Sequence, residues 1–153
     1  MELIAKDYEK IDDNRIKNWI KYGFSEPEDM KSLELLGAFM ADKYFNRKKK
    51  YYENGKNEVS SSQIIIAYGE MTRIKMKKPL DRTQINILKP KLAYATARNN
   101  NKKTYLELQR VLSIGIDTVL ESEKQSTEEK KRFSNLYNLF QAIIAYHKVN
   151  GGD

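Results

Sequence analysis

The chain has 153 residues, enough for one ordinary domain with a buried hydrophobic core. Its 40% of hydrophobic and 32% of charged residues are typical of a globular protein and too apolar for a disordered one. The absence of cysteine excludes disulfides, thiolate metal sites and cysteine nucleophiles, and the formal net charge of +7 favours nucleic acid or an anionic membrane as partner.

Apolar residues recur at spacings of three and four along the chain, which indicates amphipathic helices. Helix starts are marked by the capping-box spacing, in which a polar N-cap residue is followed three positions later by Glu or Gln. These starts are Ser25 with Glu28, Ser60 with Gln63, Asp81 with Gln84 and Ser126 with Glu129. The sequence predicts helices at 2–22, 27–46, 61–77, 82–101, 103–121 and 127–149. We therefore expect an all-α fold, a compact bundle of about five to six helices in a single domain over residues 1–153.

Cations alternate with aromatic residues around the end of the second predicted helix. The residues are Tyr44, Phe45, Arg47, Lys48, Lys49, Lys50, Tyr51 and Tyr52. Arg and Lys can neutralise phosphates while tyrosine rings stack on unpaired bases, so the segment is a candidate RNA contact. In the alternative interpretation, Tyr44 and Phe45 complete a core face and the lysines belong to a solvated loop.

The helix predicted at 61–77 opens with three β-branched residues, 64–66, which taken alone would also suit a strand. The continuation through Ala67, Met71 and Ile74 keeps helical spacing, and this favours a helix. Cations gather at its end, at Arg73, Lys75, Lys77 and Lys78. They are candidates for phosphate contact, or they complement the negative end of the helix dipole.

The helix predicted at 82–101 divides into a core stripe and two flanks. The stripe holds Ile85, Leu88, Leu92 and Ala95. One flank holds Lys91, Tyr94, Arg98 and Asn101, and the other holds Arg82 and Lys89. A groove wall with Lys91, Tyr94 and Arg98 would suit a phosphate backbone, since Arg98 can bind phosphate through two nitrogens. Alternatively, Arg98 pairs with an acid on a neighbouring helix. Pro90 is expected to bend this helix.

The last helix has the clearest apolar face. It comprises Phe133, Leu136, Phe140, Ile143, Ile144 and His147, and Gly151 and Gly152 then end the helix. His147 is the only histidine. Its place on an apolar face predicts a buried structural residue rather than a catalyst.

Positive charge is concentrated in the middle of the chain. Residues 43–110 contain 17 Lys or Arg and 5 Asp or Glu, a net charge of +12. The remaining residues contain 11 basic and 16 acidic side chains, a net charge of −5. Such asymmetry is the electrostatic pattern expected of a nucleic-acid-binding protein.

Motifs for catalysis are absent from the sequence. It has no phosphate-binding glycine loop, no histidines at metal-ligand spacing and no nucleophile elbow. Asp12 and Asp13 are adjacent, so on a helix they diverge by about 100° and cannot form an acid/base pair. We expect a non-catalytic protein with no cofactor and no metal. An acidic start and the lack of a long apolar run predict no signal peptide, no membrane span and a cytoplasmic location.

Three segments resemble the small subunits of type III-A CRISPR effectors, the Csm complex. The first is Ser61-Ser62-Gln63-Ile64 with its continuation Gly69-Glu70-Met71-Thr72-Arg73-Ile74-Lys75. The second is Leu88-Lys89-Pro90-Lys91-Leu92-Ala93-Tyr94-Ala95-Thr96-Ala97-Arg98, and the third is 140–152, from Phe140 to Gly152. The resemblance covers about 60–152, whereas residues 1–58, interpreted as N-terminal helices and a basic loop, carry none. The family's arginine after Ser-Gln-Ile is Ile65 here, so that contact cannot be carried over.

The resemblance implies a small helical bundle without nuclease activity that stacks in several copies beside the other subunits and lines the path of target RNA and guide RNA. Its role would be antiviral defence. Phosphate contacts would supply affinity without sequence preference, because base pairing to the guide supplies specificity. The candidate RNA-binding residues are Arg73, Lys77, Lys89, Lys91 and Arg98, with Arg47, Lys48, Lys49 and Lys50 as a weaker addition. Of these, Lys91 and Arg98 match family positions.

Other functions stay open at this point. A stand-alone helical nucleic-acid-binding protein would bind tightly when isolated. A purely structural subunit would use its basic residues to bridge acidic partner proteins. Binding to a membrane surface would need bulky apolar residues opposite the lysines, which the middle helices require for their core. Tyr137, Tyr146 and Trp19 could serve contacts between subunits or pack inside their own bundle.

Overall fold

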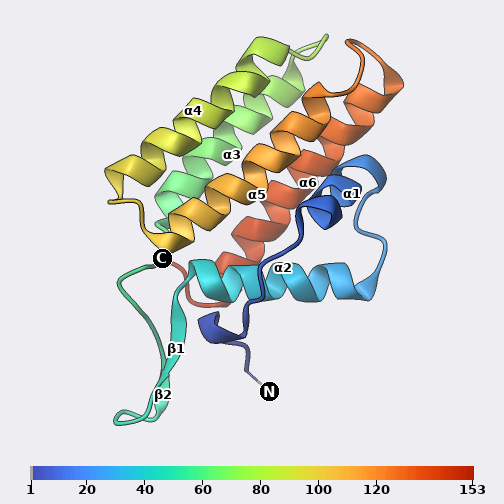
Figure 1. Cartoon of the computed structure of the whole chain (residues 1–153). Coiled ribbons are helices and arrows are strands. Elements are labelled where there is room, and N and C mark those ends of the chain that lie inside the picture. Colours follow the sequence, from blue (N-terminus) through green and yellow to red (C-terminus); the bar gives the residue numbers. More distant parts are fainter. Residues whose placement is uncertain (1) are drawn as a thin grey trace.

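A computed structural model describes residues 2–153 (Figure 1). Its helices are a short 3-10 helix, η1 (Ala5–Asp7), and six α-helices, α1 (Asp13–Tyr22), α2 (Pro27–Met40), α3 (Ser61–Met76), α4 (Arg82–Arg98), α5 (Lys103–Leu120) and α6 (Thr127–Val149). Two antiparallel strands, β1 (Lys43–Asn46) and β2 (Tyr51–Asn54), form a hairpin between α2 and α3. The expectation of an all-α bundle is therefore confirmed as fold class, with one small hairpin added.

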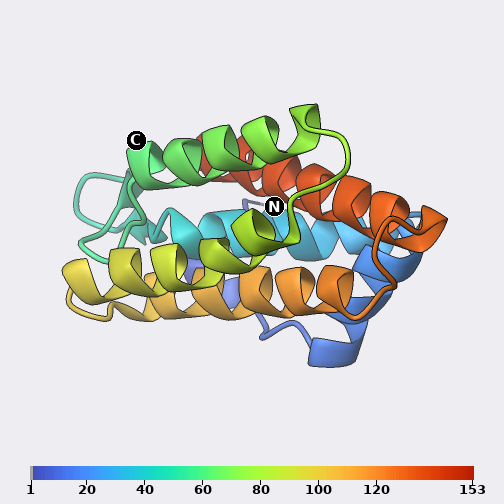
Figure 2. The same cartoon turned by 90° about the horizontal axis from the view of Figure 1, so that it is seen from above.

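The four longer helices α3 to α6 form the body of the bundle. Figure 2 shows α3 beside α6 and α4 beside α5, and both pairs are in contact. α1 packs on α5 and α6, while α2 crosses one end of α6. Within residues 2–153, no helix combines the length and the apolar character needed to cross a membrane.

Helix starts follow the capping predictions in part. The Asp81 carboxylate accepts the Gln84 N–H at 3.1 Å, and the Ser126 hydroxyl oxygen accepts the Glu129 N–H at 3.1 Å. α2 begins at Pro27 as predicted, but its N-cap is Glu26 and not the predicted Ser25. Ser60 is the N-cap of α3, although its side chain bonds the Ser62 hydroxyl instead of a backbone N–H.

Three predicted helices are wrong in their bounds. The helix predicted at 2–22 begins only at Asp13, because Asp12 adopts an extended backbone and serves as N-cap. The helix predicted at 27–46 ends at Met40, and Asp42 then takes a left-handed φ of 48° that stops it. Aromatic residues after it favour the pleated backbone of β1 and β2. α4 likewise ends at Arg98 rather than at 101, because the next turn is left-handed at positions 100 and 101.

One hydrophobic core joins residues of all six α-helices. The predicted face of α6 is confirmed, with Phe133, Leu136, Phe140, Ile143 and His147 all buried. Trp19 and Tyr137 are also buried, so they pack inside their own bundle and offer no surface to another subunit. The His147 ring bonds the Val59 carbonyl oxygen through Nε2 at 2.7 Å, which confirms its structural role.

Candidate nucleic-acid interface

Helix α4 presents the predicted stripe with one residue added. Ile85, Leu88 and Leu92 are buried as the spacing predicts, and Ala95 is partly buried and lines a cavity in the core. The added buried residue is Thr96. Thr96 is tolerated inside because its hydroxyl donates to the Leu92 carbonyl oxygen at 3.0 Å.

One flank of α4 forms a wall of a groove between α3 and α4. Lys91, Tyr94 and Arg98 all line this groove, which has a volume of about 530 Å³. The α3 side contributes Gln63 and Ile66. The Tyr94 ring is 67% exposed, and the Lys91 side chain is half-exposed. The structure therefore brings together the three residues that the helical spacing had placed on one flank.

Arg98 is exposed at the end of α4 nearest the hairpin (Figure 1). Within residues 2–153 its guanidinium forms no ion pair with an acid. The alternative in which Arg98 pairs with a neighbouring helix is therefore wrong. An exposed guanidinium without an acidic partner can donate two parallel hydrogen bonds to a phosphate.

The acid Glu70 on α3 lies between two of the cations of this surface, Arg73 and Lys91. Its Oε1 is 3.4 Å from the Lys91 ammonium and also contacts the Arg73 guanidinium. Glu70 lines the groove of Lys91 and Arg98 and also an adjoining groove of about 610 Å³ that contains Arg73 and Lys77. Four of the predicted cations thus lie along the junction of α3 and α4, together with two carboxylates, Glu70 and Asp81.

Lys89 lies on the opposite flank of α4. Its ammonium is 2.7 Å from Oδ1 of Asp117 on α5, so it does not line the groove. Arg82, on the same flank, donates to the buried Glu129 carboxylate at 2.7 Å and to the Leu120 carbonyl oxygen at 2.6 Å. Arg82 therefore ties α4 to the end of α5 and the start of α6, and part of the central positive charge is structural.

The four cations 47–50 form the exposed tip of the hairpin, away from the α3–α4 grooves (Figure 1). Tyr44 and Phe45 are 36% and 43% exposed, so the alternative in which they complete a core face is wrong. The hairpin explains this exposure, because a two-stranded ribbon has no second layer to cover its faces.

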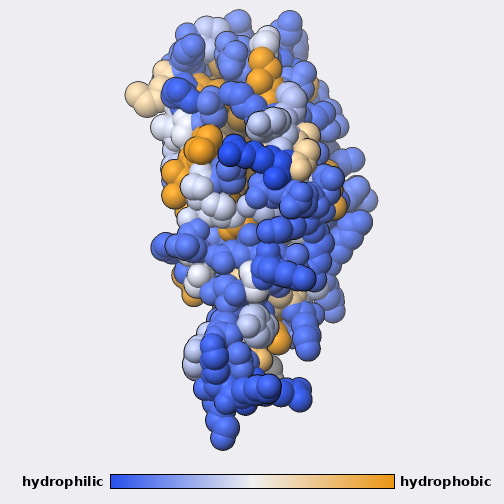
Figure 3. Space-filling model, turned by 90° about the vertical axis from the view of Figure 1, so that its left-hand side faces the viewer, coloured by the Kyte–Doolittle hydropathy of each residue, from blue (hydrophilic) through white to orange (hydrophobic). Residues whose placement is uncertain are grey.

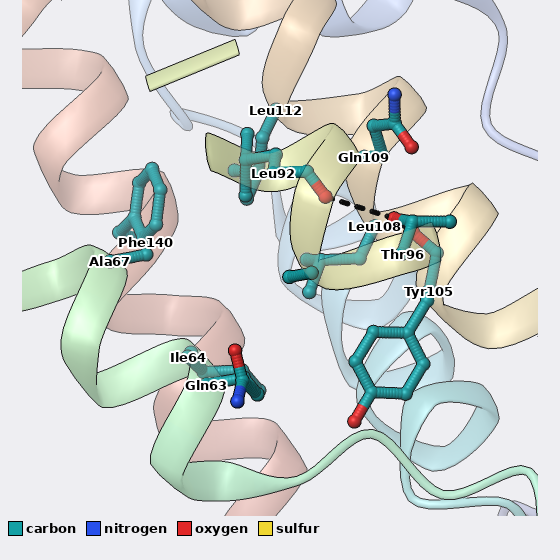
Figure 4. A pocket seen from close by; sticks show the side chains of 11 residues that line it. Gln63, Ile64, Ala67, Leu92, Thr96, Tyr105, Leu108, Gln109, Leu112 and Phe140 are labelled. Atoms are coloured by element: carbon teal, nitrogen blue, oxygen red, sulfur yellow. Dashed lines mark hydrogen bonds between the residues drawn. The ribbon is translucent and has the colours of Figure 1, made fainter. Parts of the chain in front are cut away.

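A small cavity lies in the core beside the groove (Figure 4). Its volume is about 20 Å³, room for about one water molecule, and side chains of α3, α4, α5 and α6 line it. Ala67, Leu92 and Phe140 line both the cavity and the groove. Residues 2–153 contain no group of three His, Asp or Glu side chains placed to hold a metal ion.

Sequence reasoning identified the cations at the end of α3 but not the residues of α3 that line the groove of Lys91 and Arg98. Gln63 and Ile66 line this groove, and neither was predicted to contact RNA. The spacing of Glu70 and Arg73 is that of a helical ion pair, and this signal could have been found. The contact of Glu70 with Lys91 depends on how two helices pack, which the sequence does not reveal.

A family model described as Csm2 Type III-A matches residues 42–153. The match covers well over half of the chain. The chain belongs to the Csm2 type III-A family. This family comprises small subunits of the type III-A CRISPR complex that are generally non-catalytic. No curated protein and no solved structure matches the chain.

The Csm2 match begins at residue 42, so it includes the hairpin and starts earlier than the resemblance found at 60–152. It leaves out α1 and α2, and both helices nevertheless contribute to the common core. Ile65, where the resemblance led us to expect an arginine, is 56% exposed on α3 and does not line the groove. The positive charge of the groove comes from Lys91 and Arg98 of α4.

Proposed function

We propose that this protein is a non-catalytic, RNA-binding small subunit of a type III-A CRISPR effector, acting in the cytoplasm in antiviral defence. Its copies would stack beside the other subunits along target RNA and guide RNA. The observation that carries the RNA contact is the groove in which Lys91, Tyr94 and Arg98 lie side by side in an exposed wall. Family membership supports the assembly with other subunits.

The mechanism is electrostatic. Lys91 and Arg98 bind phosphates of the RNA backbone, and Arg73 and Lys77 continue the positive path along α3. Lys89 and the hairpin tip 47–50 add further positive charge outside the groove. None of these contacts distinguishes one base from another, so sequence selection is left to pairing between guide and target.

The test is RNA binding by the purified chain over a salt series, with single-stranded RNA and matched duplexes. Lys91→Gln with Arg98→Gln should weaken binding to single-stranded RNA and make the slope of log affinity against log salt shallower by about 1.4, about 0.7 per lost phosphate contact. Lys31→Gln with Lys124→Gln removes two exposed cations elsewhere and should change the slope much less. Equal slopes for the two double variants would reject the groove as the binding surface.

A purely structural role remains the second candidate, because the same groove is partly apolar. Ile66 is 63% exposed and Tyr94 is 67% exposed, and the groove floor includes Leu88 and Phe140. Such a surface would also suit the side chains of a partner protein. No detectable RNA binding at low salt, together with loss of the Ile66→Ser variant from the assembled complex, would favour this role.

A further inference from the structure

The β1–β2 hairpin projects from the bundle as an arm. Figures 1 and 3 show it extending beyond the helices as a narrow, mainly hydrophilic projection. Its base is fixed, because the Asn54 side-chain amide donates to the carbonyl oxygens of Ala41 at 2.9 Å and of Asn150 at 3.0 Å. Lys43 adds an ion pair with Glu2 at 2.6 Å. A fixed base and a projecting tip make the arm suited to reach a partner outside the bundle.

The turn of the arm presents four consecutive cations. The Asn46 side-chain oxygen accepts the N–H groups of Lys48 and Lys49, both at 3.1 Å, and the Asn46 carbonyl oxygen accepts the Lys50 N–H at 2.7 Å. These bonds stabilise the turn, and Arg47 and the three lysines are all exposed, with Lys49 paired to Glu53. Residues 43–54 contain five basic residues and one acidic residue, a net charge of +4.

The one acid of the arm is confined to one face. The strand register places Tyr44 opposite Glu53 on that face. The Glu53 carboxylate accepts hydrogen bonds from the Tyr44 hydroxyl at 2.7 Å, the Asn46 amide at 2.8 Å and the Lys49 ammonium at 3.1 Å. These bonds lower the pKa of Glu53 to about 2, so it is ionised at neutral pH and its charge is compensated within the arm.

The other face carries an exposed aromatic pair. Phe45 and Tyr52 are cross-strand neighbours with ring centroids 5.1 Å apart, and they are 43% and 41% exposed. Neither ring belongs to the hydrophobic core or packs against it. The strand positions of this face hold no acid, and Lys43 lies 5.0 Å from the Tyr52 ring. Lys43 is paired with Glu2, whereas Arg47 and Lys50 of the turn form no ion pair within residues 2–153. Exposed rings on a strand pair whose turn carries such cations are a combination that binds unpaired nucleotides.

We propose that the arm, residues 43–54, is a second RNA contact specific for single strands. Unpaired bases stack on Phe45 and Tyr52, while Arg47 and Lys50 bind the adjacent phosphates. The inference rests on the proposed function, which supplies RNA as the ligand, and the exposed rings of Phe45 and Tyr52 add the preference for unpaired bases. In Figures 1 and 2 the arm leaves the end of the bundle where α4 ends at Arg98, so an RNA strand that follows the groove to this end meets the arm.

The experiment separates stacking from phosphate binding in the purified full chain. Phe45→Leu with Tyr52→Leu keeps apolar side chains in the hairpin but removes both rings. Binding to single-stranded RNA should weaken at least about fivefold, the lower limit for losing one stacked base. The salt slope should not change, because no charge is altered. Tyr22→Leu removes a 71% exposed ring on α1 and should leave binding unchanged.

Two further RNA ligands distinguish the loss of base stacking from other effects of the double leucine variant. An abasic RNA of equal length keeps the phosphates, so wild type and the double leucine variant should bind it equally. Duplex RNA offers no unpaired bases, and here too the two proteins should bind alike. Unchanged binding of the variant to single-stranded RNA would overturn the proposal, as would equal weakening toward all three ligands, which would indicate a disturbed hairpin or a different partner. Arg47→Gln with Lys50→Gln should instead make the salt slope shallower.

The groove variant Lys91→Gln with Arg98→Gln, measured in the same series, distinguishes the two proposals. If the groove variant binds single-stranded RNA like wild type and the arm variant binds it more weakly, the groove is rejected as an RNA contact and the arm is kept. The reverse result would reject the arm alone. Absence of RNA binding by the wild-type chain would reject both.

Discussion

At the scale of single residues, Glu70 has the most consequences for RNA binding. Its carboxylate contacts Arg73 and lies 3.4 Å from the Lys91 ammonium, in the middle of the cationic surface. A phosphate that approaches this point meets two cations already partly neutralised and a negative charge beside them. If the groove binds RNA as proposed, the negative charge of Glu70 is expected to limit the affinity.

Replacing Glu70 with Gln removes this charge and keeps the side-chain shape. We expect tighter binding to single-stranded RNA and a steeper salt slope, since Arg73 and Lys91 become free to contact phosphates. Glu123→Gln makes the same charge change in the exposed loop between α5 and α6 and should have a much smaller effect. The measurement is fluorescence anisotropy with labelled RNA over a salt series. Equal affinities of the Glu70 variant and wild type would contradict this role of Glu70.

Residue-level prediction worked where one helix determined the answer. The 3.6-residue period placed Lys91, Tyr94 and Arg98 on one flank of α4, and they line one groove. It failed where two helices meet, because the ion pair of Lys91 with Glu70 and that of Lys89 with Asp117 depend on tertiary packing. The acids that pair with a cation decide which cations remain available to RNA, and spacing along one helix does not identify them.

At the scale of elements, the hairpin is the main departure from the predicted helices. Apolar spacing predicted that the second helix extends to residue 46, but this helix ends at Met40. Beyond that point Tyr44, Phe45 and the residues after them are compatible with helix and strand alike. The choice is made by Asp42 with φ of 48° and by Lys50 with φ of 60°, two left-handed residues that are not glycines. The amino-acid composition does not predict a left-handed φ at either residue.

The crossing of α2 over α6 depends on a glycine. A Cβ atom on Gly37 would lie 2.6 Å from the backbone carbonyl carbon of Tyr146 on α6. Backbone cannot move aside as a flexible side chain can, so a larger residue would force the two helices apart. Gly69 on α3 is also inside a helix, but a Cβ atom there would meet nothing within 4 Å.

The two glycines therefore predict opposite outcomes for the same substitution. Gly37→Ala should lower the free energy of unfolding, because overpacking costs about 1–3 kcal/mol and outweighs the gain in helix propensity. Gly69→Ala should raise it by about 0.5–1 kcal/mol, since only the propensity term acts. Urea unfolding followed by circular dichroism measures both. A stabilised Gly37→Ala variant would show that α2 and α6 are less closely packed than described.

At the scale of the whole molecule, much of the positive charge concentrated in residues 43–110 forms ion pairs that stabilise the fold. Arg110 of the basic segment pairs with Asp13 at 2.6 Å and with Glu107 at 2.7 Å, which ties α5 to the start of α1. Burial would raise the pKa of Glu107, but hydrogen bonds from Arg110 and Tyr8 outweigh it and lower that pKa. The proposed RNA contacts use the cations of the α3–α4 grooves and of the arm. Net charge alone favours an acidic partner and does not locate these two surfaces.

His147 packs against the residues that follow α6 at the C-terminal end of the molecule. Its ring packs so closely against Gly152 that a Cβ atom on that glycine would lie 2.2 Å from Cε1, and its Nε2 donates to the Val59 carbonyl oxygen. Burial lowers the pKa of His147 below its ordinary 6.5, against the opposing effects of the Val59 hydrogen bond and of Glu58. The folded state therefore favours the neutral ring. In the unfolded chain, the ring becomes protonated as the pH falls through its ordinary pKa of 6.5.

Because the folded pKa is the lower one, His147 contributes stability that is complete above pH 6.5 and is lost as pH falls from there toward the folded pKa. The melting temperature of the wild type should thus fall between about pH 7.5 and about pH 5. In His147→Gln, whose amide can still donate to Val59, this fall should be much smaller, although the variant is less stable at neutral pH. Carboxylates with lowered pKa values, such as Glu107, lose their contribution only at lower pH, so this window isolates the histidine. The same pH dependence in both proteins, measured by calorimetry, would show that another group is responsible.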